Sequence, residues 1–92
     1  MITHKHSLLE IITAVAHADG VRPEDICGGG RDWGHMCRRF VVIHMAREDG
    51  RSLSEIGRAV GRDHTTILSA IRRIDQYRER NDTRWQQMQD LV

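Results

Sequence analysis

Residues 52–68 carry the sequence SLSEIGRAVGRDHTTIL, which predicts the central structural motif of the domain. Ser52 and Glu55 have the Ser-x-x-Glu spacing of a capping box, which predicts that a helix begins here. Gly61 interrupts that helix with a residue that tolerates a positive φ. Asp63 is then a favourable N-cap for a second helix, because its carboxylate accepts hydrogen bonds from free backbone N–H groups. Two short helices joined by a glycine-containing turn predict a helix-turn-helix.

A further glycine of this stretch, Gly57, favours a helix-turn-helix over an ordinary helical hairpin. It lies where the two helices must approach closely, so a larger side chain would push them apart. We expect the motif to span residues 52–72. Its interface is predicted to be closed by small and branched apolar side chains: Ile56, Val60, Ile67 and Ala70.

A second Ser-x-x-Glu capping box, at Ser7 and Glu10, together with glycines and helical periodicity outside the motif, predicts an all-α fold of about six short helices. The predicted helices span residues 7–18, 23–27, 35–48, 52–60, 63–80 and 83–91. The last of them carries Trp85, Met88 and Leu91 on one side. We expect this side to pack on the first helix, with a dimer contact as the alternative.

The length of the chain limits the number of domains. Its 92 residues suffice for one core and leave no room for an added ATPase or Rossmann-type enzyme domain. We predict a single domain over residues 1–92, with a core of about 7–80 and a helical extension over 81–92. The chain lacks both a secretory signal and an apolar run of ~20 residues, which predicts a cytoplasmic, nucleoid-associated protein without membrane contact. The Met1 start favours a stand-alone protein over an excised domain.

Basic residues are concentrated in the middle of the chain. The net charge is only +1, but residues 31–80 hold eleven arginines against seven carboxylates. Arginine is suited to bidentate contacts with phosphate and with guanine. Arginine-rich surfaces also occur on ordinary soluble helices, so the role of each arginine has to be inferred from its position in the predicted fold.

Polar side chains crowd the start of the second helix of the motif: Arg62, Asp63, His64, Thr65 and Thr66. A recognition helix presents this end to base edges, and its free N–H groups favour a phosphate. Threonine hydroxyls reach bases or phosphates, and an aspartate accepts a hydrogen bond from cytosine N4. Asp63 is alternatively only an N-cap, or serves both roles. Since no nucleophile, carboxylate partner or metal site is paired with His64, we expect no catalysis.

Residues 28–34 form a glycine-rich loop, GGGRDWG, without the Gly-Lys-Ser/Thr of a phosphate-binding P-loop. The loop is either a plain linker or a mobile arm that carries Arg31. Four residues in and around it could assemble a metal site: Cys27, His35, Cys37 and His44. Their spacing lacks the close cysteine pairs of structural zinc sites. We therefore expect reduced, buried cysteines and no metal or other cofactor.

The run from Ser52 to Leu68, above all its Arg-Asp-His-Thr-Thr core after Glu-Ile-Gly, resembles the C-terminal DNA-binding domain of the bacterial replication initiator DnaA. The similarity extends more weakly over about residues 7–80. It implies a six-helix domain related to the Trp-repressor fold. It also implies base contacts in the major groove by Arg62, Asp63, His64 and Thr65. Arg31 matches an arginine that enters the adjacent minor groove, and phosphate contacts are implied for Arg38, Arg39, Ser54 and Thr66.

The chain departs from the pattern of this family in its glycines. A single glycine, Gly61, precedes the Arg-Asp-His run where the family usually has two. The loop before the third helix is about one residue shorter, and three glycines replace a basic run. We therefore expect fewer phosphate contacts and a shallower dependence of affinity on salt. The ATPase domain of the initiator is absent from the chain.

These observations predict sequence-specific binding of double-stranded DNA by a monomeric, non-enzymatic transcriptional regulator, with RNA polymerase or another regulator as a further partner. One alternative is a regulator of replication initiation that binds or competes for initiator sites. A second is a protein-interaction adaptor that has lost DNA affinity, which the near-neutral charge supports. A third is a zinc- or thiol-dependent module that uses Cys27 and Cys37.

Overall fold

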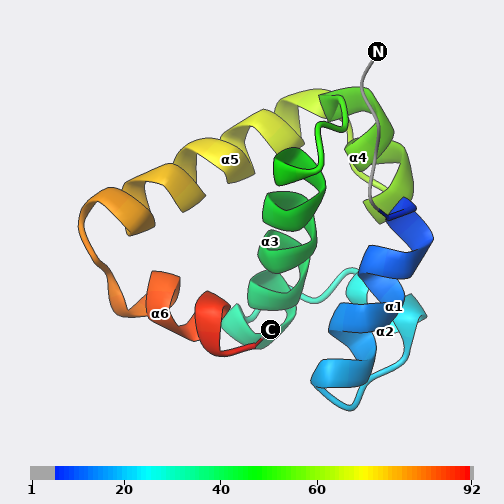
Figure 1. Cartoon of the computed structure of the whole chain (residues 1–92), viewed down its shortest axis with the longest axis horizontal. Helices are drawn as coiled ribbons and strands as arrows, with labels where there is room; N and C mark the ends of the chain where they lie inside the picture. The colour runs from blue at the N-terminus through cyan, green and yellow to red at the C-terminus, as the bar shows by residue number, and fades with distance from the viewer. Residues whose placement is uncertain (1–5, 92) are drawn as a thin grey trace.

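The computed structural model describes residues 6–91, and these fold into six α-helices without a strand (Figure 1). The all-α prediction is confirmed. The helices are α1 (Leu8–Ala18), α2 (Pro23–Ile26), α3 (Trp33–Glu48), α4 (Leu53–Val60), α5 (His64–Glu79) and α6 (Thr83–Asp90). Residues 1–5 and 92 of the predicted domain lie outside the described part of the chain. None of the helices in residues 6–91 has the length and apolar character needed to cross a membrane.

The predicted capping boxes begin two of these helices. The Glu10 N–H donates to the Ser7 Oγ at 3.0 Å at the start of α1, and the Glu55 N–H donates to the Ser52 Oγ at 3.1 Å at the start of α4. In each box the glutamate side chain accepts the N–H of the capping serine in return. Local sequence alone therefore determines where these helices start.

The third helix begins earlier than predicted, at Trp33 instead of His35. Asp32 takes the extended conformation of an N-cap, with φ −67° and ψ 162°. The Trp33 ring packs edge-on against the rings of Phe40 and Tyr77, with centroid separations of 6.1 and 6.0 Å. This tertiary packing outweighs the helix-breaking tendency of the glycine at position 34.

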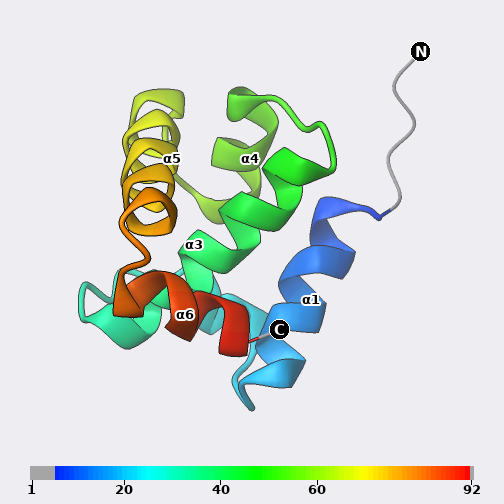
Figure 2. The ribbon, with the colours of Figure 1, turned by 60° about the vertical axis from the view of Figure 1, so that its left-hand side comes forward.

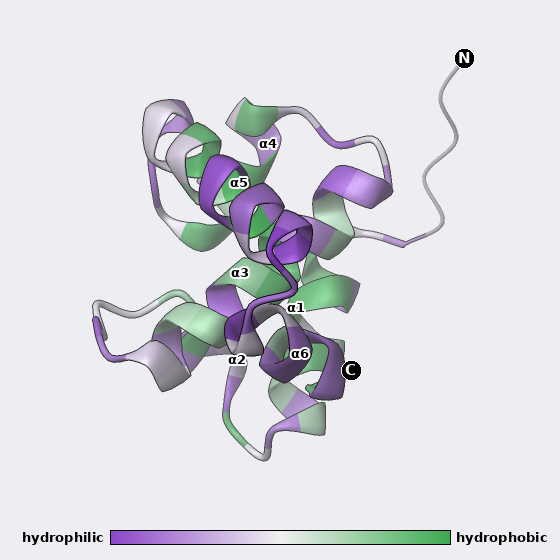
Figure 3. Ribbon diagram, turned by 90° about the vertical axis from the view of Figure 1, so that its left-hand side faces the viewer, coloured by the Kyte–Doolittle hydropathy of each residue, from purple (hydrophilic) through white to green (hydrophobic). Residues whose placement is uncertain are grey.

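Helix α3 is the centre of the molecule. It runs between α1 on one side and the α4–α5 pair on the other (Figure 2), and α6 covers its beginning. Because it is contacted from several sides, five consecutive residues, 39–43, are buried. Hydrophilic and apolar residues alternate along α5, whereas most of α6 is hydrophilic (Figure 3).

The last helix, α6, packs mainly against α3 and α5. Its Met88 is 1% exposed, and its Trp85 ring meets the ring of His44 on α3 edge-on at 5.3 Å. The prediction that this helix packs on the first helix was therefore wrong. A short turn after α5 sends the chain back over the start of α3 (Figure 1), an arrangement that helical periodicity does not encode.

Candidate nucleic-acid interface

The turn between α4 and α5 has the geometry that its two glycines predict. Gly61 adopts the left-handed conformation, with φ 72° and ψ 34°. The Arg62 N–H donates to the carbonyl of Gly57 at 2.8 Å and closes the turn. A Cβ added at Gly57 would lie 2.4 Å from the Arg62 carbonyl oxygen, which is a severe overlap with backbone. Only glycine at this position permits the observed approach of the two segments.

Asp63 caps the N-terminus of α5. Its Oδ1 accepts the Thr66 N–H at 2.8 Å and the Thr65 hydroxyl at 2.7 Å. The bond from the Thr65 hydroxyl, followed by the bond from the Thr66 N–H, lowers the pKa of Asp63 to about 2. The carboxylate is therefore ionised at neutral pH, and the Thr65 hydroxyl keeps its lone pairs available for a donor.

The side chains that follow the cap face solvent. His64, Thr65 and Thr66 are all exposed on the first turn of α5, and Ser54 is exposed on the first turn of α4. The His64 side chain makes no hydrogen bond within residues 6–91. The two helix starts thus present a polar surface that is open to a ligand.

The loop that carries Arg31 spans residues 27–32 between α2 and α3, and we call it the Arg31 loop. Arg39 anchors the first part of this loop from α3. Its guanidinium donates to the carbonyls of Gly28, at 3.0 Å, and of Gly30. The Arg39 side chain lies inside the molecule, with the residue only 8% exposed, and burial together with the nearby charge of Arg62 lowers its pKa.

Arg62 anchors the same loop from the turn of the motif. It donates to the carbonyl of Gly28 at 2.8 Å and to that of Val60 at 2.9 Å. In this structure Arg39 and Arg62 therefore connect the Arg31 loop to the helix-turn-helix. Sequence reasoning missed this role, because an arginine that binds carbonyls from a distant segment has the same local pattern as one that binds phosphate.

Two other predicted residues lie in different surroundings. Arg31 itself is exposed. The Nε of Arg38 donates to the carboxylate of Asp19 after the end of α1, and the Arg38 side chain is only 19% exposed. The structure thus brings Arg31 close to the motif, whereas Arg38 is engaged in an ion pair with the residue that ends α1.

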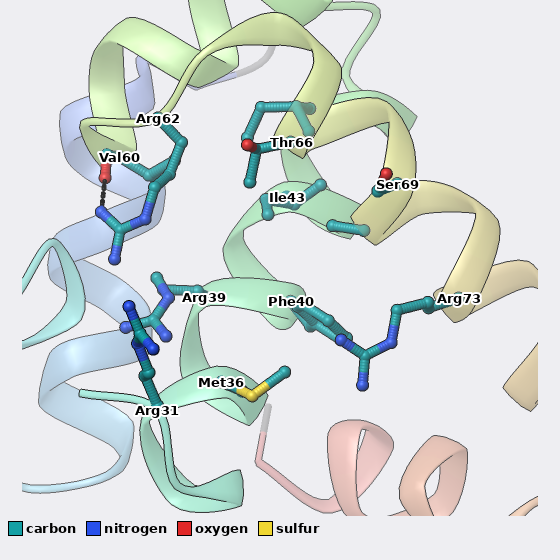
Figure 4. A pocket seen from close by; sticks show the side chains of 12 residues that line it. Arg31, Met36, Arg39, Phe40, Ile43, Val60, Arg62, Thr66, Ser69 and Arg73 are labelled. Atoms are coloured by element: carbon teal, nitrogen blue, oxygen red, sulfur yellow. Dashed lines mark hydrogen bonds between the residues drawn. The ribbon is translucent and has the colours of Figure 1, made fainter. Parts of the chain in front are cut away.

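A cavity of about 190 Å³ lies between the Arg31 loop, α3 and α5 (Figure 4). None of its lining residues is acidic, and four of them are arginines: Arg31, Arg39, Arg62 and Arg73. Apolar side chains, among them Met36, Phe40 and Ile67, form much of the remaining wall. We call this hollow the arginine-lined cavity. It separates the exposed Arg31 on the loop from the exposed start of α5.

Arg73 and Ser69 complete the α5 side of the cavity, and sequence reasoning did not single them out. The Arg73 guanidinium lies 5.3 Å from the centroid of the Phe40 ring and donates to the Tyr77 hydroxyl at 3.0 Å. Positions 66, 69, 70 and 73 share one face of a helix, so helical spacing from Thr66 could have identified Ser69 and Arg73 as neighbours of the site.

The four residues of the metal alternative are not brought together. No group of three or more His, Cys, Asp or Glu side chains within residues 6–91 is arranged to hold a metal ion. The Cys27 thiol donates to the Ala59 carbonyl at 3.4 Å, and burial raises the pKa of the Cys37 thiol. His35 instead hydrogen-bonds Asp32, and His44 packs on α6. The zinc alternative therefore has no site in this part of the chain.

The Gly57 approach, the left-handed Gly61 and the capped start of α5 define a helix-turn-helix domain of the DNA-binding class. A family model described as the bacterial dnaA protein helix-turn-helix matches residues 9–74. The chain belongs to this family.

Similar proteins carry the name chromosomal replication initiator protein DnaA. One from Thermus thermophilus is 42% identical over 73 residues, which cover 77% of this chain and 17% of the relative. DnaA 2 of Protochlamydia amoebophila is 34% identical over 74 residues, covering 79% of the chain and 16% of the relative. DnaA of Ruegeria sp. is 36% identical over 74 residues, covering 78% of the chain and again 16% of the relative. The chain thus spans about one sixth of the length of these proteins.

Proposed function

We propose that this chain binds double-stranded DNA in a sequence-specific manner, with the start of α5 in the major groove and Arg31 in the adjacent minor groove. The observation that carries the proposal is the pair of exposed contact elements on either side of the arginine-lined cavity. In B-DNA one sugar-phosphate strand separates neighbouring grooves. A hollow with basic and apolar walls fits such a strand, since phosphates meet arginines and sugars meet apolar side chains.

Within this proposal His64 and Thr65 contact base edges, and Thr66 and Ser54 contact phosphates. Asp63 both caps α5 and accepts a hydrogen bond from a base amine such as cytosine N4, because its carboxylate stays ionised. A base contact by Arg62 requires its bonds to Gly28 and Val60 to break, so we assign Arg62 and Arg39 to support of the Arg31 loop. The proposal includes no catalytic step.

The experiment is a selection from random duplexes, followed by affinity measurements on the enriched site with Arg31→Ala and His64→Ala. Arg80→Ala is the matched control for loss of one charge, because Arg80 is exposed just after the far end of α5. We expect an enriched motif, weaker binding by the first two variants and unchanged binding by the control. If no motif is enriched, or if neither variant binds more weakly than the control, the proposal is wrong.

The biological process is a separate part of the proposal. The relatives are named as replication initiators, which favours a role at replication-initiator sites over the transcriptional role that we predicted from the sequence. A map of DNA occupancy in cells distinguishes the two, because occupancy at the replication origin supports the first role and occupancy confined to promoters supports the second.

The adaptor alternative has one supporting observation, the net charge of +1. A salt titration of complex formation tests it. DNA binding through phosphate contacts weakens as salt rises, with a slope set by the number of phosphates neutralised. An adaptor without DNA affinity gives no duplex complex even at low salt.

A further inference from the structure

Helix α6 lies beyond residues 9–74, the part of the chain that matches the family model, yet it contacts the start of α3. Part of this contact is a side-chain hydrogen bond: the indole Nε1 of Trp33 donates to the Oε1 of Gln87 at 2.6 Å. Trp33 is the first residue of α3 and follows the Arg31 loop directly. A residue of α6 therefore binds the residue that directly follows this loop.

The Gln87 side chain is exposed, but the helix that carries it is held in place, because α6 is attached to the rest of the molecule on both sides of Gln87. Met88 is 1% exposed, and the Arg84 guanidinium lies 5.3 Å from the centroid of the Tyr77 ring. Tyr77 in turn contacts the Trp33 ring. The hydrogen bond thus joins α3 to α6, and both helices are held by other contacts with the rest of the molecule.

The Arg31 loop is consequently held at both ends. Arg39 and Arg62 bind the carbonyls of its first half, as described above, and the Trp33 side chain fixes its last peptide against α6. Arg31 lies between these two anchors. A loop with three glycines can adopt many conformations. Contacts that restrict the loop in the free protein therefore lower the conformational entropy that is lost when it binds DNA.

We propose that Gln87 is a positioning residue for minor-groove recognition: it holds Trp33 and thereby presents Arg31 at a fixed distance from α5. The inference rests on the proposed function, because it assumes that Arg31 enters the minor groove. It goes beyond that function by making α6 part of the DNA-reading module. Gln87 acts through Trp33 and makes no DNA contact of its own.

The test compares Gln87→Ala with Gln89→Ala in the full chain. Gln89 is exposed on the same helix, so its variant removes the same chemical group without the indole bond. Affinities are measured on the selected duplex and on two single changes, one at the minor-groove position that Arg31 reads and one at a position read by α5. Gln87→Glu, which keeps an acceptor oxygen, serves as the conservative rescue.

We expect Gln87→Ala to lower affinity for the selected duplex by up to about tenfold, the loss of one hydrogen bond to a positioned group. It should also reduce discrimination between A·T and G·C at the minor-groove position, while discrimination at the α5 position stays unchanged. Gln89→Ala should behave as wild type, and Gln87→Glu should restore most of the difference. In the Arg31→Ala background, Gln87→Ala should have no further effect.

Each other result overturns the inference. If wild type binds its selected duplex but Gln87→Ala binds equally well, Gln87 has no positioning role. If Gln87→Ala weakens all duplexes alike, or adds its full effect to that of Arg31→Ala, its role is general stability of the fold. If wild type selects no duplex at all, the proposed function fails and this inference fails with it.

Discussion

Replacement of Gly57 by alanine tests whether the close approach in the helix-turn-helix determines the stability of the domain. The new Cβ would lie 2.4 Å from the Arg62 carbonyl oxygen, about 1 Å inside ordinary contact, and both partners are backbone. Overpacking of this kind costs about 1–3 kcal/mol, and movement of the turn also weakens the Arg62 to Gly57 hydrogen bond, worth about 1 kcal/mol. Alanine regains about 1 kcal/mol of helix propensity. The net expectation is a loss of about 1–3 kcal/mol in the free energy of unfolding.

Urea unfolding followed by circular dichroism measures this loss. With a slope of about 1 kcal/mol per molar urea, the midpoint should fall by about 1–3 M. Gly29→Ala is the matched control, since a Cβ there meets nothing within 4 Å, and it should leave the midpoint unchanged or slightly raised. Gly61→Ala, with φ 72° but little crowding, should cost about 1–2 kcal/mol. A Gly57→Ala midpoint equal to that of the Gly29 control would refute the reasoning.

Three further predictions concern the charged and polar groups of the interface. The folded-state pKa of Asp63 is lowered from 3.8 to about 2, so the ionised carboxylate stabilises the fold above about pH 4, and this stabilisation is lost as the pH falls toward 2. The variant Asp63→Asn keeps an acceptor oxygen but does not titrate. Its acid unfolding should therefore lack the loss of stability between about pH 4 and pH 2 that the wild type shows. Arg39→Ala should destabilise the fold by about 2–3 kcal/mol in urea unfolding, and Arg39→Lys should not rescue it, because lysine lacks the planar fork that binds two carbonyls. Thr65→Ala should cost about 1–3 kcal/mol in binding to the selected duplex and relax selectivity at one base position, whereas equal weakening of all duplexes would place its contact on phosphate.

The features that the sequence predicted are those with local causes. The capping boxes at Ser7 and Ser52 involve residues three apart in the chain, and the turn requires glycine at two positions. Such patterns determine where helices begin and how α4 meets α5. They were sufficient to locate the exposed polar start of α5 and to name Gly57 as the point of close approach.

The features that the sequence did not predict depend on contacts between distant segments. The bond from Trp33 to Gln87 joins residues 54 positions apart, and the bond from Arg62 to Gly28 joins residues 34 positions apart. No spacing rule relates these partners, because each contact exists only after α6 and the Arg31 loop have packed on α3. The error in placing α6 has the same origin: its apolar side fits any apolar surface, and only the turn after α5 selects the start of α3.

The same long-range contacts change how the arginines contribute to DNA affinity. Several of the eleven arginines in residues 31–80 already bind groups within the chain, among them Arg38, Arg39, Arg51 and Arg62. An arginine that holds a carbonyl or a carboxylate releases no DNA counterion unless that bond breaks. The salt-dependent part of the affinity should therefore be smaller than the arginine content suggests. More of the binding selectivity must then come from the placement of a few exposed side chains, which is why the anchors of the Arg31 loop matter as much as Arg31 itself.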